Sequence, residues 1–261
     1  MHGDSFADPL SCASRSVDLS RQPIDPLVFE SRSAIWVTDA GGSNLMELYS
    51  QPLKQSGTPR WSPDGEWIAF DCGRFASGWE VYVIRSGGGK PVLLTPGMAF
   101  AAIPTWSMDG KWVYFASTVS GQSQVWKTRS SGGDAVQVTR KGGRVAFESH
   151  DGKTLFYTKH DLGESGGLWR MPVGGGEEEL VIPSVAGRNF AVANSGVYFI
   201  EATGEQAFIR FLLFATGKVK TVASIPSWGH GISVSPDERF LIYSRPDESP
   251  NGLMLVENFR P

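Results

Sequence analysis

Hydrophobic positions along this chain occur in short runs rather than in long amphipathic stretches. The runs are rich in Val, Ile, Phe, Tyr and Trp, as at residues 68–70, 81–84 and 113–115, and Asp-Gly, Gly-Gly or other turn residues separate them. None of the runs follows the 3.6-residue period of a helix. Short runs between turn residues are typical of β-hairpins, so the sequence predicts an all-β protein.

The runs belong to a repeated unit. The first run of a unit leads into Trp-Ser-Pro-Asp-Gly at residues 61–65. Two further runs and a glycine-rich turn follow, and a fourth run before Thr95 ends the unit. The turn positions of successive copies lie about 42–45 residues apart, at Asp64, Asp109, Asp151, Ser195 and Asp237. Such a period, with four strands per unit, predicts the blades of a β-propeller. Because a blade buries its faces only against its neighbours, the blades must form a ring.

The copies predict a six-bladed β-propeller of four-stranded antiparallel blades over residues 26–261. A partial copy within residues 27–48 precedes the complete ones, and the last copy lacks an outer strand. Since exposed strand edges must be protected, we expect the N-terminal segment, residues 1–25, to complete the last sheet as a clasp through residues 17–19. The alternative is that this segment is a non-native start and that the chain is part of a longer protein. The ring would then close through non-native strand pairing or by pairing with a second chain in a dimer.

These repeats resemble the TolB-like (WD-like repeat) β-propeller family, whose units carry a Trp-Ser-Pro-Asp-Gly-x-x-Ile-Ala-Phe core. Residues 61–70 match this core, and residues 106–110 depart from it only at Met108. The ending at residues 253–259 is similar to the tail of larger bacterial multidomain proteins. The resemblance implies protein docking, peptidase gating or a sensor role, and a periplasmic or other extracytoplasmic location. It carries over no catalytic activity, because function depends on sites rather than on the fold.

Composition and charge argue against two kinds of partner. The formal net charge is −3 at an isoelectric point near 5.8, and no basic run occurs, so we expect no nucleic-acid binding. No apolar stretch is long enough to predict a transmembrane segment, and the start of the chain predicts no signal peptide. The two cysteines, Cys12 and Cys72, lack the spacing of a metal site.

Two motifs imitate catalytic or phosphate-binding sites. Residues 163–167, Gly-Glu-Ser-Gly-Gly, match a hydrolase pattern with His160 nearby. They lie between two predicted strands, however, whereas a nucleophile elbow needs a strand before it and a helix after it. The glycine runs at 86–90 and 174–176 lack the spacing and the helix of a phosphate loop. We interpret all three segments as loops or hairpin turns.

The mouth of the central channel is the predicted site. Inner strands run along the axis of a propeller, and the loops that lead into them are expected to ring one mouth, where a ligand binds. The residues predicted to bind it are Arg60, Thr105, Arg144, Phe147, Arg188, Asn189 and Trp228, with Thr58 beside them. His230 lies in a glycine-flanked segment at 227–231, and Glu148 occupies the position that tryptophan fills in two sister blades.

Two function classes fit these residues. The first, favoured by the lack of catalytic motifs, is a recognition domain that binds a protein, a peptide or a small ligand at the mouth. The alternative is a metal-assisted hydrolase of ester or phosphate-ester substrates. In that alternative Glu148, Asn189 and His230 hold a divalent metal in the channel, or Glu148 and His230 act as acid and base.

A structural interpretation of the same residues competes with the catalytic one. Glu148 would then pair with Arg144 or Arg188 in a salt bridge, and His230 would be a polar residue of the mouth without chemistry. His150, which replaces the turn proline, and His160, which lies in a loop, are expected to be exposed and inert.

Overall fold

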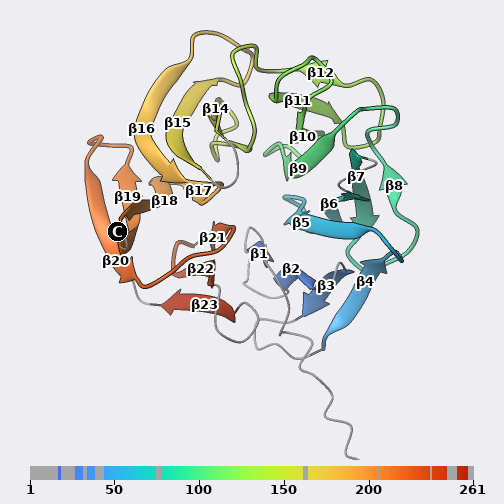
Figure 1. The fold of residues 1–261 in the computed structure, drawn as a ribbon, viewed down its shortest axis with the longest axis horizontal. Helices are drawn as coiled ribbons and strands as arrows, with labels where there is room; N and C mark the ends of the chain where they lie inside the picture. Colours follow the sequence, from blue (N-terminus) through green and yellow to red (C-terminus); the bar gives the residue numbers. More distant parts are fainter. Residues whose placement is uncertain are drawn as a thin grey trace, which may run out of the picture.

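The computed structural model describes residues 17–18, 27–31, 34–38, 44–74, 78–160, 164–204, 206–235, 237–245 and 252–257. Their strands form six antiparallel sheets, five with four strands and one with three. Figure 1 shows the sheets as a ring around a central axis, with one strand of each sheet innermost. The predicted class, an all-β propeller of four-stranded antiparallel blades, is confirmed. Within the described residues, no helix has the length and apolarity that crossing a membrane requires.

Each blade is built from strands that follow one another along the chain. The first two blades comprise β1 (Val17–Asp18), β2 (Leu27–Ser31), β3 (Ala34–Thr38), β4 (Met46–Ser50), β5 (Gln55–Trp61), β6 (Trp67–Arg74), β7 (Gly78–Arg85) and β8 (Val92–Leu93). The third and fourth comprise β9 (Ala101–Trp106), β10 (Trp112–Ser117), β11 (Gln124–Arg129), β12 (Val136–Gln137), β13 (Ala146–Glu148), β14 (Thr154–Thr158), β15 (Ser165–Pro172) and β16 (Glu179–Ala186). The last two comprise β17 (Phe190–Val192), β18 (Gly196–Thr203), β19 (Gln206–Leu213), β20 (Val219–Ile225), β21 (Ile232–Val234), β22 (Phe240–Arg245) and β23 (Gly252–Glu257).

Strand β1 closes the ring differently from the predicted clasp. It pairs with β2, in the register Val17 to Phe29 and Asp18 to Val28, and is the inner strand of the first blade rather than the outer strand of the last. It contacts β5 on one side and β21 on the other, and the other inner strands contact one another in turn. The clasp prediction was wrong because a two-residue strand without a turn motif carries no repeat pattern. The described inner strands thus form a closed ring, not the open one that a dimer would complete.

A hydrogen-bonded turn ends the inner strand in four blades. A serine Oγ donates to Oδ1 of the aspartate two residues later, at 2.5–2.7 Å, in the pairs Ser62–Asp64, Ser107–Asp109, Ser149–Asp151 and Ser235–Asp237. The same Oγ accepts the backbone N–H five residues further on, at the start of the second strand. In three of these turns a glycine adopts a φ of 67–70°, the left-handed region that glycine enters without steric cost.

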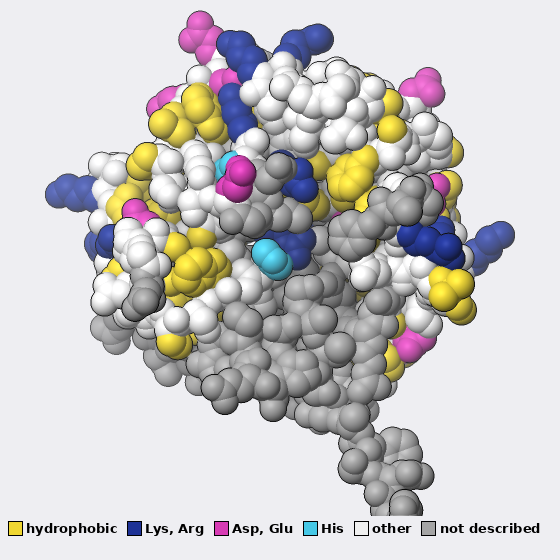
Figure 2. Space-filling model, viewed as in Figure 1, with side chains coloured by type: hydrophobic (Ala, Val, Ile, Leu, Met, Phe, Trp, Pro, Cys, Tyr) yellow, Lys and Arg dark blue, Asp and Glu magenta, His cyan; other side chains and the backbone are white. Residues whose placement is uncertain are grey.

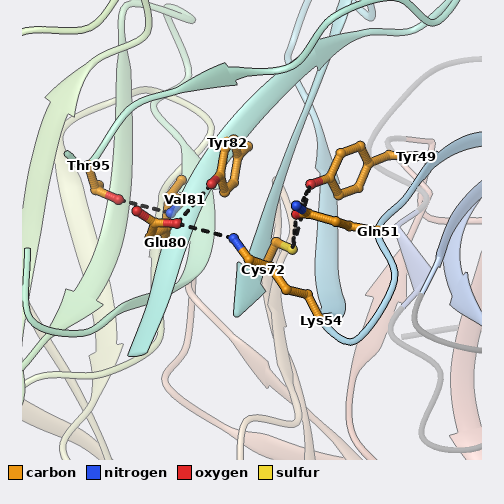
Figure 3. Close-up of polar contacts among 8 residues, drawn as sticks. All are labelled: Tyr49, Gln51, Lys54, Cys72, Glu80, Val81, Tyr82 and Thr95. Carbon is orange, nitrogen blue, oxygen red and sulfur yellow. Dashed lines mark hydrogen bonds and ion pairs between the residues drawn. The ribbon is translucent and has the colours of Figure 1, made fainter. Parts of the chain in front are cut away.

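Aromatic packing joins neighbouring blades, as it does the first and the second. Figure 3 shows the polar contacts around two of the tyrosines involved, Tyr49 and Tyr82. The ring of Tyr49, on β4, lies 4.8 Å from that of Phe70, which lies 5.7 Å from the ring of Tyr82. The Tyr49 hydroxyl lies 3.8 Å from the sulfur of Cys72, a buried free thiol. At the edge of this layer the Tyr82 hydroxyl donates to Glu80. Burial and these neighbours raise the pKa of Tyr49 and Tyr82, so both remain neutral donors in the seam.

Gly196 tests how tightly the strands of the fifth blade pack. A β-carbon at this position would collide with the carbonyl oxygen of Leu212 and the ring of Phe211. We expect Gly196→Ala to lower the free energy of unfolding by about 3 kcal/mol, measured by urea denaturation, because overpacking strains the backbone. Gly174→Ala is the matched control, since no atom lies within 4 Å of the added carbon. Equal midpoints for the two variants would contradict the packing argument.

Candidate functional site

A cavity of about 380 Å³ lies where the inner strands end, and we call it the axial pocket. It is lined by the last residues of five inner strands, Trp61, Trp106, Glu148, Val192 and Val234. It is also lined by the residues just before three of these, Arg60, Thr105 and Phe147. Cavities of about 300–1,000 Å³ with mostly apolar walls and a few polar groups are typical of ligand sites.

The middle residue of the Ser-x-Asp turn completes the wall of the pocket. This residue is Pro63 in the second blade, Met108 in the third and His150 in the fourth, and all three line the cavity. The serine and aspartate on either side are bonded to each other, so the turn keeps its shape whichever residue stands between them. The repeat therefore places three variable side chains around one pocket.

The fifth and sixth blades form their share of the pocket in another way. The fifth blade replaces the usual turn by a shorter one, in which the Ala193 N–H donates to the carbonyl of Gly196. Glu238, in the sixth blade, occupies the glycine position of the turn at a φ of 55°. Its carboxylate accepts the backbone N–H of Ser195 at 3.1 Å and the Ser195 hydroxyl at 2.6 Å. These bonds tie the short turn to the sixth blade and hold that side of the pocket.

Four of the residues predicted to form the site meet in the axial pocket: Arg60, Thr105, Phe147 and Glu148. The Arg60 guanidinium carbon lies 5.4 Å from the centroid of the Phe147 ring, a cation–π contact between blades that are not adjacent. The Thr105 hydroxyl donates to the Ala146 carbonyl at 2.6 Å. Arg60 and Thr105 are buried, so the pocket has a fixed wall with polar groups.

Glu148 links the fourth blade to the third. Its Oε1 accepts the Tyr114 hydroxyl at 2.6 Å, and its Oε2 accepts the Met108 backbone N–H at 2.8 Å. Burial, then the bond to Glu148, raises the pKa of Tyr114, so this phenol stays a donor at any ordinary pH. The sequence suggested an arginine partner, a metal or an acid–base role for this carboxylate. The structure shows it as an acceptor between blades.

The remaining candidates lie at the other end of the inner strands, so the prediction of a single mouth was wrong. Each of these residues precedes the inner strand of its own blade: Arg144, Arg188, Asn189, Trp228 and His230. None of them lines the axial pocket. Local sequence could not reveal this division, because residues a few positions apart on one strand lie at opposite ends of it.

Asn189 serves the backbone at this second end. Its side-chain nitrogen donates to the carbonyls of Ala186 and Gly229, and its oxygen accepts the Gly231 N–H at 2.6 Å. The amide therefore holds the loop that carries His230. Burial and then the charge of Arg188 lower the pKa of His230, so its imidazole is neutral at physiological pH. Figure 2 shows basic side chains and a histidine near the centre of one face of the ring.

Asp71, on β6, is a buried carboxyl group that bridges the second and third blades. Its Oδ2 accepts the Thr58 hydroxyl at 2.6 Å and the Ile103 N–H at 2.7 Å. Thr58 and Ile103 both have positive φ, at the bulges of β5 and β9. Desolvation raises the pKa of Asp71 in spite of these bonds and of the Arg188 charge. Asp71 could not be singled out from the sequence, because its partner Ile103 is 32 residues away.

Among the described residues, the side chains predicted to hold a metal or to act as acid and base do not meet at one place, because Glu148 ends its inner strand whereas Asn189 and His230 precede theirs. No group of three His, Cys, Asp or Glu side chains that could hold a metal ion exists among the described residues. Ser165 is the first residue of strand β15, so residues 165–167 of this motif belong to a strand and not to the predicted loop. The motif leads into a strand and not into the helix that a nucleophile elbow needs. His150 and His160 are half-buried rather than exposed, and His160 Nε2 lies 2.8 Å from the Gly187 carbonyl oxygen.

A family model of the TolB beta propeller domain matches residues 22–224. The chain belongs to this family. The predicted resemblance is thereby confirmed, and the match covers the blades that contribute most of the axial pocket. No curated protein matches this TolB-domain chain in sequence.

Solved structures share the fold of this TolB-domain chain. TolB of Acinetobacter baumannii superposes with a TM-score of 0.72 at 20% identity, over 94% of this chain and 61% of its own. A candidate TolB of Agrobacterium tumefaciens gives 0.72 at 17% identity, over 95% and 91%. A chain of a nidogen/laminin complex gives 0.69 at 11% identity, over 84% and 85%. The chain thus spans less than two thirds of the Acinetobacter protein, and these identities establish the fold alone.

Substitution of Glu148 distinguishes a link between blades from a catalytic group. We expect Glu148→Ala to lower the free energy of unfolding by about 3 kcal/mol, because the Tyr114 hydroxyl and the Met108 N–H lose their acceptor inside the protein. Glu148→Gln is the control, since its amide oxygen can accept the Met108 N–H while its amide N–H donates to the Tyr114 oxygen, and we expect a loss of about 1 kcal/mol. Urea denaturation measures both. Full stability of Glu148→Ala would contradict the structural role.

The lowered pKa of His230 predicts a pH-dependent stability. Below the ordinary histidine pKa of about 6.5 the unfolded chain takes up a proton that the folded chain resists, so the folded state loses stability as the pH falls. We expect the melting temperature of wild type to fall more than that of His230→Asn between about pH 7.5 and pH 5. His150, whose pKa burial also lowers, remains in both proteins, so the difference reports His230. Parallel pH profiles would contradict the assignment.

Proposed function

We propose that this propeller is a recognition domain that binds a peptide segment of a partner protein in the axial pocket. The carrying observation is the cavity itself, which five blades build at the ends of their inner strands. Its walls combine the apolar faces of Trp61, Trp106 and Phe147 with a few fixed polar groups. Pockets of this composition suit a side chain that is inserted from outside.

Two further observations support a binding role. Several polar groups near the axis bond to neighbouring blades, among them Asp71, Glu148 and Asn189, and so contribute rigidity. A rigid pocket loses little conformational freedom when a ligand enters, which favours affinity. The fold is also shared with a chain from a nidogen/laminin complex, an assembly of two proteins.

The alternative, a metal-assisted hydrolase, requires Glu148 and His230 to act on one substrate. Glu148 ends β13, whereas His230 precedes β21, so the two belong to opposite ends of the inner strands. No specific observation favours this second function, and we propose the recognition domain alone.

Peptide selection tests the proposal. A random peptide library displayed on phage is selected on the purified chain, and enriched peptides are synthesised and titrated by fluorescence anisotropy. Asn194 is exposed and lines the axial pocket, so the indole of Asn194→Trp would obstruct it. We expect this variant to weaken binding about tenfold or more, a loss of about 1.4 kcal/mol.

The control is Gln122→Trp, which adds the same indole at an exposed site between β10 and β11, outside the pocket. We expect it to bind the peptides like wild type. Failure to enrich any peptide that binds better than its scrambled version would overturn the proposal. Equal binding by wild type and Asn194→Trp would overturn it as well.

A further inference from the structure

The axial pocket shares a wall with a second cavity, of about 440 Å³, at the seam between the third and fourth blades. We call it the seam groove. It is formed by the turns that contain Asp109 and Asp151 and by the side chains of Trp112, Tyr114 and Lys127. The residues that line both cavities are Met108, Glu148 and His150. The two cavities are therefore adjacent, without a blade between them.

The three shared residues are the places where the third and fourth blades depart from the Trp-Ser-Pro-Asp-Gly pattern. Met108 and His150 stand where the second blade has Pro63, and Glu148 stands where it has Trp61. The serine and aspartate of both turns are kept, and their hydrogen bonds are intact. The departures are thus not needed to form the turns. Local breaks in an otherwise consistent repeat are expected where a protein binds or acts.

Two carboxylates of the seam groove have an oxygen that the turn does not use. Oδ1 of Asp109 and of Asp151 accepts the turn serine and a backbone N–H. Oδ2 of Asp109 lies 3.2 Å from the ammonium of the solvent-exposed Lys111, and Oδ2 of Asp151 lies 3.8 Å from that of Lys153. Exposed pairs of this kind are weak and readily exchanged. The serine hydroxyls lower the pKa of both aspartates, so both are charged at neutral pH.

The rest of the groove offers aromatic faces that suit a cation. The ammonium of Lys127 lies 4.8 Å from the ring centroid of Trp112 and 5.7 Å from that of Tyr114, and the guanidinium carbon of Arg129 lies 4.1 Å from the centroid of Trp112. Attraction between a cation and these rings adds to the attraction of the carboxylates. The groove is lined by the carboxylates of Asp109, Asp151 and Glu148 and by the ammonium of Lys127. The cations beside it, Lys111, Lys153 and Arg129, are exposed, and their contacts are readily exchanged. The carboxylates of the groove therefore suit a basic group of a partner that takes the place of these cations.

We propose that the axial pocket and the seam groove bind one extended peptide segment, with an apolar side chain in the pocket and a lysine or arginine in the groove. This inference rests on the proposed peptide recognition and adds the chemistry of the partner. An extended segment advances about 3.3 Å per residue, so side chains close together in its sequence can enter neighbouring cavities. Met108 and His150, between the cavities, then contact the backbone of the segment.

The test compares wild type with the double variant Asp109→Asn/Asp151→Asn. Asparagine keeps an oxygen that accepts both turn hydrogen bonds, so the turns remain while the charges are lost. Peptides selected on wild type are expected to contain an apolar residue close to a lysine or arginine. Each enriched peptide is titrated beside an analogue in which citrulline replaces arginine or acetyl-lysine replaces lysine.

We expect loss of the peptide's charge to weaken binding to wild type about tenfold but to the double variant less than about threefold, because the charge no longer has its partners. Asp64→Asn/Asp237→Asn, at the equivalent turns outside the groove, should behave like wild type. The inference fails if peptides that Asn194→Trp blocks show no basic residue, or lose equal affinity in both proteins. If no peptide is enriched at all, the proposed function fails with it.

Discussion

The hydrogen bond from serine to aspartate in the turn after the inner strand organises this propeller. It fixes the turn, and the same serine oxygen accepts the first N–H of the next strand, so inner strands of different blades end at the same level. A cavity forms at this level because five strand ends surround it. Since serine and aspartate stabilise the turn between them, the residue that separates them is free to vary. The residues at this variable position, Pro63, Met108 and His150, line the pocket.

Where this turn is absent, another interaction takes its place. The fifth blade has a shorter turn, and Glu238 reaches from the sixth blade to bond its Ser195. Glu238 adopts a left-handed φ that glycine holds in the sister turns, a strain of about 1 kcal/mol that two bonds to a carboxylate offset. The wall of the axial pocket therefore continues past the fifth blade, although this blade lacks the Ser-x-Asp turn.

Much of the fold could be predicted from the sequence, since the turn motif and the glycine pairs recur with a constant period. Strand β1 could not be predicted as the inner strand of the first blade, because its two residues are not followed by the turn motif of the repeat. The site was predictable in part: Arg60, Thr105, Phe147 and Glu148 do line one pocket. The hydrogen-bond partners of these residues could not be predicted. Contacts between blades join residues about 30–45 positions apart, as between Glu148 and Tyr114, and no local sequence pattern encodes them.

The same contacts between blades decide which kind of function suits the channel. A catalytic carboxylate or imidazole needs an atom directed at a substrate, and its hydrogen bonds must change during the reaction. Asp71 and Glu148 instead accept bonds from groups of the next blade, and Asn189 holds the loop of the sixth blade in the same way. Withdrawing any of them would leave buried donors unsatisfied, which opposes movement. In the proposed recognition role, a channel held in this way binds by shape and charge, and we expect its specificity to depend on groups that the turns do not require, such as Met108, His150 and the outer oxygens of Asp109 and Asp151.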